Sequence, residues 1–73
     1  MKSWLNCQLK FGKNLRQLRK GKGLSQEALA HEADLDRSYV GQVERGECNI
    51  SLINICKLAD ALGLPPNKLL DFS

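Results

Sequence analysis

Apolar residues recur at intervals of three and four along this 73-residue chain, and valine and isoleucine do not gather into alternating runs. Such spacing is typical of amphipathic helices rather than of strands. The pattern therefore predicts an all-α fold of five short helices. Their expected ranges are 9–20, 26–33, 37–45, 52–62 and 67–72.

The residues that flank these ranges are of types that begin and end helices. Ser51 can cap the fourth helix, and glycines follow the first, third and fourth. Pro65-Pro66 interrupts the chain, yet proline suits a first helical turn, which favours a last short helix. The stripes expected to face the core are Phe11, Leu15 and Leu18 in the first helix and Leu52, Ile55, Leu58, Ala59 and Leu62 in the fourth.

The second and third ranges form a helix-turn-helix pattern. Ser25 and Asp36 each precede a helix, and both residue types accept hydrogen bonds from the free amides of a first turn. Between them lie one short helix and a brief turn. In DNA-binding proteins with this motif, the second of the two helices enters the major groove.

The third helix is polar on one face and apolar on the other. At about 100° per residue, the polar face consists of Arg37, Ser38, Gly41, Gln42 and Arg45. Val40 and Val43 point the opposite way and are expected to pack on the second helix, with Tyr39 at the edge of that buried side. Any surface helix has a polar face, but small residues between long donors favour close approach to another surface.

The donors on this polar face suit recognition of base pairs. Arg37 can donate two parallel hydrogen bonds to O6 and N7 of guanine, and Gln42 can pair with adenine or reach a phosphate. Ser38 can do either more weakly. The sequence therefore predicts direct base contacts from the start of the third helix.

Two further groups of residues are candidates for phosphate contacts. Ser25 and Gln26 stand at the start of the second helix, where free amides and the helix dipole favour an anion. Arg45, Asn49 and Ser51 surround the start of the fourth helix and predict a second phosphate contact. Capping alone accounts equally well for Ser51, and the two roles are compatible.

Charge is unevenly distributed along the chain. The net charge is only +3, yet seven cations precede Glu27, the first acidic residue. Such a basic segment indicates either a polyanionic partner or a solvated helix face. The helix-turn-helix pattern favours the first reading, with double-stranded DNA as the partner.

Composition argues against several other classes of protein. A chain this short holds one domain, 1–73, and its small core needs tight packing or a partner subunit. No apolar run approaches the length of a membrane span and no export signal is seen, so a cytoplasmic protein is expected. Three dispersed cysteines and the lone His31 predict neither a disulfide framework nor a metal site. Without catalytic residues or a cofactor motif, an enzyme is not expected.

Three stretches of the sequence match a known family: LSQEALA at 24–30, ERG at 44–46 and LADALGL at 58–64. They resemble the lambda-repressor-like, or Cro/C1-type, helix-turn-helix domains. Within that family, LDRSYV at 35–40 and NISLINI at 49–55 are most similar to the controller proteins of restriction-modification systems. Those are single-domain homodimers that regulate the endonuclease gene and their own. GQV at 41–43 departs from the usual controller pattern, so the operator sequence does not follow from the resemblance.

The resemblance also implies roles for individual residues. It places Arg37, Ser38, Tyr39 and Gln42 at positions that face DNA. In phage repressors of the family, an arginine late in the first helix pairs with the glutamate of the Glu-x-Gly motif, and these positions are Arg19 and Glu44 here. A buried pair of that kind fixes one helix against another more than it adds net stability.

Motif, charge and fold together predict a sequence-specific transcriptional regulator that binds as a homodimer to a two-fold symmetric operator. The alternatives are a phage-type repressor and an antitoxin-like module that holds a protein partner with the same fold. A regulator that activates would also contact RNA polymerase, through an exposed acidic residue such as Glu47.

The chain ends in an apolar tail that is the predicted dimer surface. Its residues are Leu64, Leu69, Leu70 and Phe72. They are more apolar than a monomer of this size needs to expose. The alternative is that they cover the core of their own subunit.

Overall fold

The computed structural model describes residues 3–72, apart from the side chains of residues 3 and 5. A short 3₁₀ helix, η1 (Ser3–Asn6), leads into α1 (Cys7–Gly21), which is followed by α2 (Gln26–Ala33) and α3 (Arg37–Glu44). The chain continues through α4 (Leu52–Leu62) to a second 3₁₀ helix, η2 (Pro66–Lys68). No strand occurs in this range, so the all-α prediction is confirmed. None of the described helices has the length and apolar character needed to cross a membrane.

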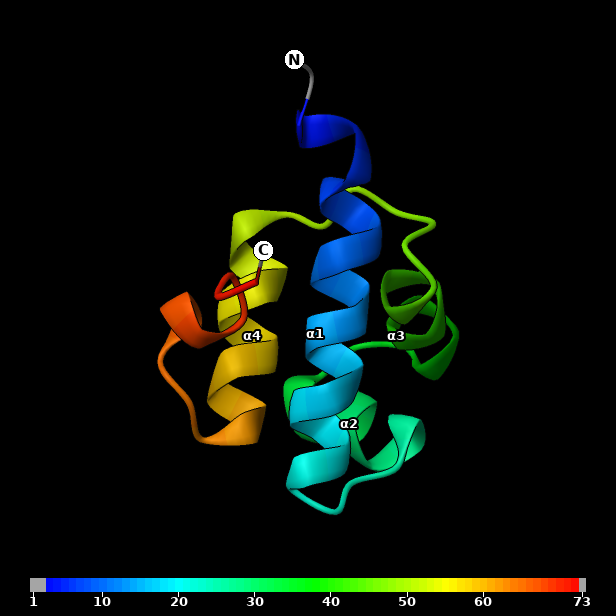
Figure 1. The fold of residues 1–73 in the computed structure, drawn as a ribbon. Coiled ribbons are helices and arrows are strands. Elements are labelled where there is room, and N and C mark those ends of the chain that lie inside the picture. Colours follow the sequence, from blue (N-terminus) through cyan, green and yellow to red (C-terminus); the bar gives the residue numbers. More distant parts are fainter. Residues whose placement is uncertain (1–2, 73) are drawn as a thin grey trace.

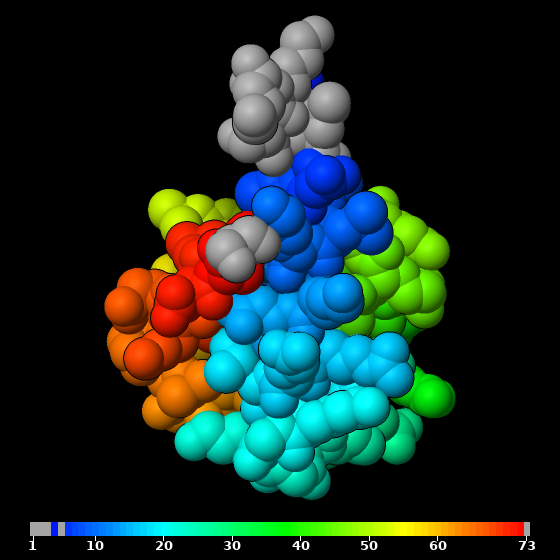
Figure 2. Space-filling model, in the orientation of Figure 1, coloured from blue at the N-terminus to red at the C-terminus, as the bar shows by residue number. Residues whose placement is uncertain are grey.

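The helix α1 runs through the middle of the molecule. Figure 1 shows α3 on one side of α1, α4 on the other, and α2 near the C-terminal end of α1. The helices α1 and α2 both contact α3, and α2 also contacts α4. In the space-filling view, the outer surface of α1 is open along its length, from blue to cyan (Figure 2). This arrangement leaves α3 at the surface with its outward face free.

The predicted caps fix where the helices begin. The side chains of Ser25, Asp36 and Ser51 each accept a hydrogen bond from a first-turn backbone amide, at 3.0–3.1 Å. The turn between α2 and α3 is closed by Asp34, whose φ of 57° lies in the left-handed region. Aspartate tolerates this conformation better than most residues other than glycine. The helix-turn-helix unit is thus set by local sequence.

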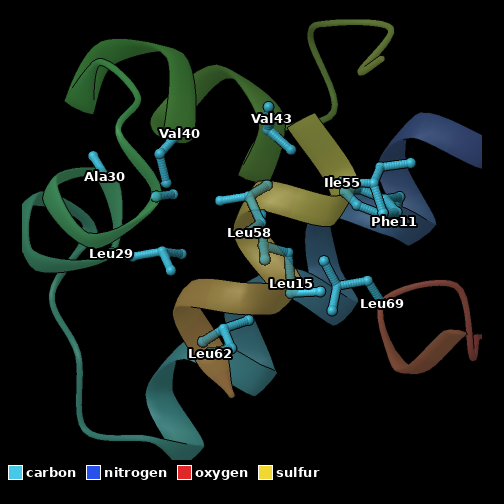
Figure 3. Packing of buried hydrophobic residues seen from close by; sticks show 12 residues of the cluster. Phe11, Leu15, Leu29, Ala30, Val40, Val43, Ile55, Leu58, Leu62 and Leu69 are labelled. Atoms are coloured by element: carbon cyan, nitrogen blue, oxygen red, sulfur yellow. The ribbon is translucent and has the colours of Figure 1, made fainter. Parts of the chain in front are cut away.

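The core is formed by one apolar stripe from each α-helix and one residue of the tail. Figure 3 shows these side chains converging between the helices. The buried hydrophobic residues are Phe11, Leu15, Leu29, Ala30, Ala33, Val40, Val43, Ile55, Leu58, Ala59, Leu62 and Leu69. Burial of Val40 and Val43 confirms the predicted inner face of the third helix, whereas Gly41, which the sequence placed on the polar face, is also buried.

Leu52 does not belong to that core, although the sequence placed it on the inward stripe of the fourth helix. It is 72% exposed, and its neighbour Ile53 is 70% exposed. Leu52 is the first residue of α4, and the buried stripe begins only at Ile55. The start of α4 therefore presents apolar surface to the outside.

The sequence predicted a last helix over 67–72, and no α-helix forms there. The chain forms only the three-residue η2 there, so four α-helices are present among the described residues rather than five. So short a helix gains few hydrogen bonds for its nucleation cost. The Nδ2 of Asn14 donates instead to the carbonyl oxygens of Lys68 and Leu69, at 3.0 and 2.9 Å, and ties the tail to α1.

The helices α1 and α3 cross in direct backbone contact at Gly12. A Cβ at this position would lie 2.6 Å from the carbonyl oxygen of Glu44 and closer still to that of Val43. Only glycine allows this approach. The sequence gives no local sign of it, because Gly12 lies inside a helix where alanine would be intrinsically more stable.

Candidate nucleic-acid interface

The outward face of α3 carries the side chains expected to reach bases. Arg37, Ser38 and Gln42 are all exposed. Among the described residues, the side chains of Arg37 and Gln42 make no hydrogen bond. The hydroxyl of Ser38 donates to Oδ1 of Asp36 at 3.1 Å, so its oxygen is left as an acceptor. The face therefore presents donors from the two long side chains and an acceptor from the short one.

A buried hydrogen-bond network centred on Glu44 holds three helices together. Arg19 of α1 donates to both carboxylate oxygens of Glu44, from Nε at 2.6 Å and from Nη2 at 3.0 Å. The side chains are only 9% and 3% exposed. The Nη1 of Arg19 also donates to the carbonyl oxygen of Leu24, at 2.8 Å. The two residues that the resemblance pairs are thus in contact, and their ion pair links α1 to the end of α3.

Gln26 joins the same network from the start of α2. Its Nε2 donates to Oε1 of Glu44 at 3.0 Å. This bond occupies one of the two side-chain N–H groups, and the other remains for an external acceptor. The backbone N–H groups in the first turn of α2 have no partner within the helix. The network therefore fixes the start of α2, where a phosphate contact was predicted, relative to α3.

The residues around the start of α4 are exposed, as a phosphate contact needs. Asn49 and Ser51 lie at the surface. The Oγ of Ser51 accepts from a backbone amide, so its own O–H is free to donate outward. Arg45 donates from Nε to Oε2 of Glu47 at 3.0 Å. That hydrogen bond and the carboxylate charge raise the pKa of Arg45 above its ordinary value. The pair is exposed, and pairs of this kind are weak enough for a phosphate to displace.

Tyr39 lies at the edge of the exposed polar face of α3 rather than on it. Its side chain is half-buried and packs against the core. Its hydroxyl oxygen accepts a hydrogen bond from Nδ2 of Asn54, in α4, at 3.0 Å. Asn54 was not identified from the sequence. Its position four residues before the buried Leu58 could have identified it, because this spacing puts Asn54 on the inward-leaning side of α4.

The predicted dimer surface is only partly available. Leu69 has no exposed surface, so its assignment to an interface is wrong: it fills the core of its own chain. Phe72 is half-buried and packs edge-to-face on Phe11, with ring centroids 6.4 Å apart. Leu64 is also half-buried, whereas Leu70 is 49% exposed. Other large hydrophobic residues at the surface are Trp4, Leu9, Leu52 and Ile53.

The cysteines and the histidine are the remaining residues with candidate chemistry. All three cysteines are free, and His31 is exposed on α2. No group of three or more potential metal ligands is found within the part of the chain that the structure describes.

Known proteins are similar to this chain both in sequence and in the arrangement of the helices. The profile of the HTH_3 family, described as helix-turn-helix, matches residues 15–69. The chain is 51% identical over 69 residues to control protein C.BamHI of Bacillus amyloliquefaciens, which covers 93% of this chain and 85% of that protein. Control protein C.MunI of a Mycoplasma species is 43% identical over 65 residues, 88% of each chain. The crystal structure of the restriction-modification controller protein C.AhdI from Aeromonas hydrophila superposes with a TM-score of 0.83 at 62% identity, over 84% of this chain and 92% of that one.

Proposed function

The chain belongs to the Cro/C1-type helix-turn-helix family of DNA-binding transcriptional regulators, and we propose that it is a restriction-modification controller. It acts in the cytoplasm as a homodimer on a two-fold symmetric operator. Each subunit places α3 in one of two successive major grooves on the same side of the duplex. Similarity to controllers along nearly the whole chain supports this proposal over a phage-type repressor.

The exposed groups divide into those that contact bases and those that contact phosphates. Arg37, Ser38 and Gln42 read base edges from α3. The start of α2, with Ser25 and Gln26, binds a phosphate on one side of the groove. The segment with Arg45, Asn49 and Ser51 binds a phosphate on the other side. Phosphate contacts fix register, whereas the base contacts provide the sequence preference.

The observation that carries the proposal is the free polar face of α3, with Arg37 exposed at its start. Selection of bound sites from random duplexes tests it. We expect an enriched sequence with two-fold symmetry and an affinity that falls steeply with salt, because phosphate binding releases counterions. No enrichment, or a binding constant indifferent to salt, would refute the proposal and favour a protein partner.

Arg37→Ala is expected to weaken binding by about 1–3 kcal/mol per half-site and to relax the preference at one base position. The reason is the loss of two parallel hydrogen bonds to a single base. Affinity for the selected site and for its single-base variants is measured by fluorescence anisotropy at fixed salt.

Lys68→Ala is the matched control for the Arg37 variant. It removes one positive charge from η2, on the other side of α1 from α3 (Figure 1). We expect it to leave the preference at every position unchanged. Equal weakening on all sequences by Arg37→Ala would show that Arg37 contacts the backbone instead.

We place the dimer surface on exposed apolar residues of α4 and the tail. Ile53 and Leu64 line one shallow groove with Pro66, and Leu70 is exposed nearby along the chain. Apolar surface of this kind is unusual for a monomer this small. Burial against a second copy removes it from water.

Ile53→Asp and Leu70→Asp are each expected to give a folded protein that sediments as a monomer and binds the operator weakly. A charge on an apolar interface must be desolvated without a partner. Leu69→Asp is the contrasting variant, and we expect it to unfold, because Leu69 is fully buried in its own chain. Analytical ultracentrifugation with circular dichroism separates these outcomes. If both surface variants sediment like the parent protein, the dimer uses another face.

A further inference from the structure

The N-terminal third of the chain carries positive charge that the proposed contacts of α2, α3 and α4 do not account for. Seven cations precede Glu27, the first acidic residue. Of those that the structure describes, Arg19 alone has a carboxylate partner, and it is buried in the network around Glu44. The other cations of α1 are Lys10, Lys13, Arg16 and Lys20.

These four side chains share the outer face of α1, which we call the α1 basic face. At about 100° per residue, all four lie at least about 100° from the buried Leu15. Three of them are exposed and Lys10 is half-buried. Figure 2 shows the outer surface of α1 open along its length. Within residues 3–72, none of the four forms an ion pair. The α1 basic face is therefore available to a partner outside the subunit.

The α1 basic face has charge of one sign and a length that fits a DNA strand. No acidic residue lies on α1. Asp71 of the tail lines a shallow hollow beside Lys10 and Lys13 but pairs with neither. At 1.5 Å per residue, the face extends about 15 Å from Lys10 to Lys20. Phosphates along one strand of a duplex recur about every 3.4 Å of helix axis, so the four cations span about four phosphates.

The composition of the face favours duplex DNA over a protein or a single strand. The exposed residues of α1 between 13 and 20 are all polar: Lys13, Arg16, Gln17 and Lys20. The centres of protein interfaces are apolar and depleted in lysine, whereas DNA interfaces are polar and strongly positive. Single-stranded bases stack on aromatic side chains, and none lies among these residues.

The α1 basic face is separate from the polar face of α3 that we propose reads bases. Figure 1 shows α3 to one side of α1, and the helices meet at Gly12 rather than at the four cations. Duplex DNA is stiff over the length of a binding site. A duplex seated on α3 is therefore not expected to curve onto the outer face of α1 as well, which leaves this face for another duplex.

We propose that the α1 basic face binds the phosphate backbone of a second DNA duplex, without sequence preference, while α3 holds the operator. The proposed dimer presents this face twice, so it bridges the operator to another stretch of DNA. The bridging state goes beyond the regulatory function proposed above, and it rests on that function for the operator-bound complex.

Capture of a second duplex by the operator complex tests this binding. Operator DNA fixed to beads is saturated with protein, washed, and mixed with a fluorescent duplex that lacks the operator. We expect the complex to retain the labelled duplex, with retention that falls steeply as salt is raised. Combining Lys13→Gln, Arg16→Gln and Lys20→Gln in one protein is expected to reduce retention at least about tenfold, because three phosphate contacts are lost.

The matched control removes three charges elsewhere, with Lys22→Gln, Lys57→Gln and Lys68→Gln in one protein. These side chains are also exposed and lie outside α1, and the two triple variants have the same net charge. We expect the control to retain the labelled duplex nearly as well as the parent protein. Both triple variants are expected to bind the operator with equal affinity and to give the circular dichroism spectrum of the parent.

Each other outcome contradicts a particular part of the argument. Equal loss of retention in both triple variants would overturn the proposal, because net charge alone would then explain it. Weaker operator binding by the α1 variant than by the control would place the α1 basic face on the operator duplex itself. Binding of polyglutamate without retention of the second duplex would indicate an acidic protein partner instead. A parent protein that selects no sequence from random duplexes would refute the regulatory function, whereas loss of retention confined to the α1 variant supports the second DNA surface.

Discussion

Glu44→Ala is expected to lower the free energy of unfolding by about 3–5 kcal/mol, the cost of leaving one member of a buried ion pair without its partner. The guanidinium of Arg19 would remain buried, with its two hydrogen bonds to the carboxylate lost. Gln26 would lose its acceptor as well. Urea unfolding followed by circular dichroism, at one fixed protein concentration, measures the change.

Two further variants distinguish the contribution of the buried network to stability from that of charged residues in general. Glu47→Ala breaks the exposed pair with Arg45, and we expect no measurable change in stability because such pairs contribute little. Replacing both members of the buried pair, Arg19→Met with Glu44→Met, is expected to recover much of the loss. A Glu44→Ala protein as stable as Glu47→Ala would show that the network does not hold the helices.

The double replacement also separates stability from function. The ion pair links α1 to α3, and Gln26 links α2 to the same carboxylate. A folded protein without this network keeps its helices, but the start of α2 is no longer fixed against the end of α3. We therefore expect the double variant to bind the operator more weakly than its stability alone would predict.

Features that depend on neighbours in the chain were predictable from the sequence. The caps at Ser25, Asp36 and Ser51 and the burial of Val40 and Val43 follow from residue type and spacing, and the structure has them where expected. The exposure of Arg37, Ser38 and Gln42 follows from the same helical geometry. The paired positions Arg19 and Glu44 came from family resemblance, since no local signal joins residues so far apart.

Features that depend on distant parts of the chain were not predictable. The burial of Leu69 requires η2 to fold back on α1, and the hydrogen bonds from Asn14 that hold it there join residues more than fifty apart. The exposure of Leu52 depends on which helices end beside the start of α4. The contact of Asn54 with Tyr39 likewise exists only once α3 and α4 are packed. In each case the outcome depends on what lies opposite the residue, and periodicity along one helix does not say what that is.

Gly12→Ala is expected to destabilise the protein by about 3 kcal/mol, at the upper end of the usual cost of overpacking. The new methyl group would collide with the carbonyl oxygens of Val43 and Glu44, which are backbone atoms and cannot rotate away. The helices α1 and α3 would have to separate. Because the contact lies at the end of α3, the helix proposed to enter the major groove, we also expect weaker operator binding by the fraction that remains folded.

Gly21→Ala is the control for this substitution, since it adds the same methyl group to the same helix. A Cβ at Gly21 would meet no atom within 4 Å, and Gly21 is not among the positive-φ glycines. Alanine is the better helix former, so we expect this variant to be as stable as the parent or about 0.5–1 kcal/mol more stable. The difference between the urea midpoints of the two variants then measures the cost of the steric contact between α1 and α3. Equal midpoints would mean that α1 and α3 adjust to a methyl group without cost, and that Gly12 does not set the position of α3.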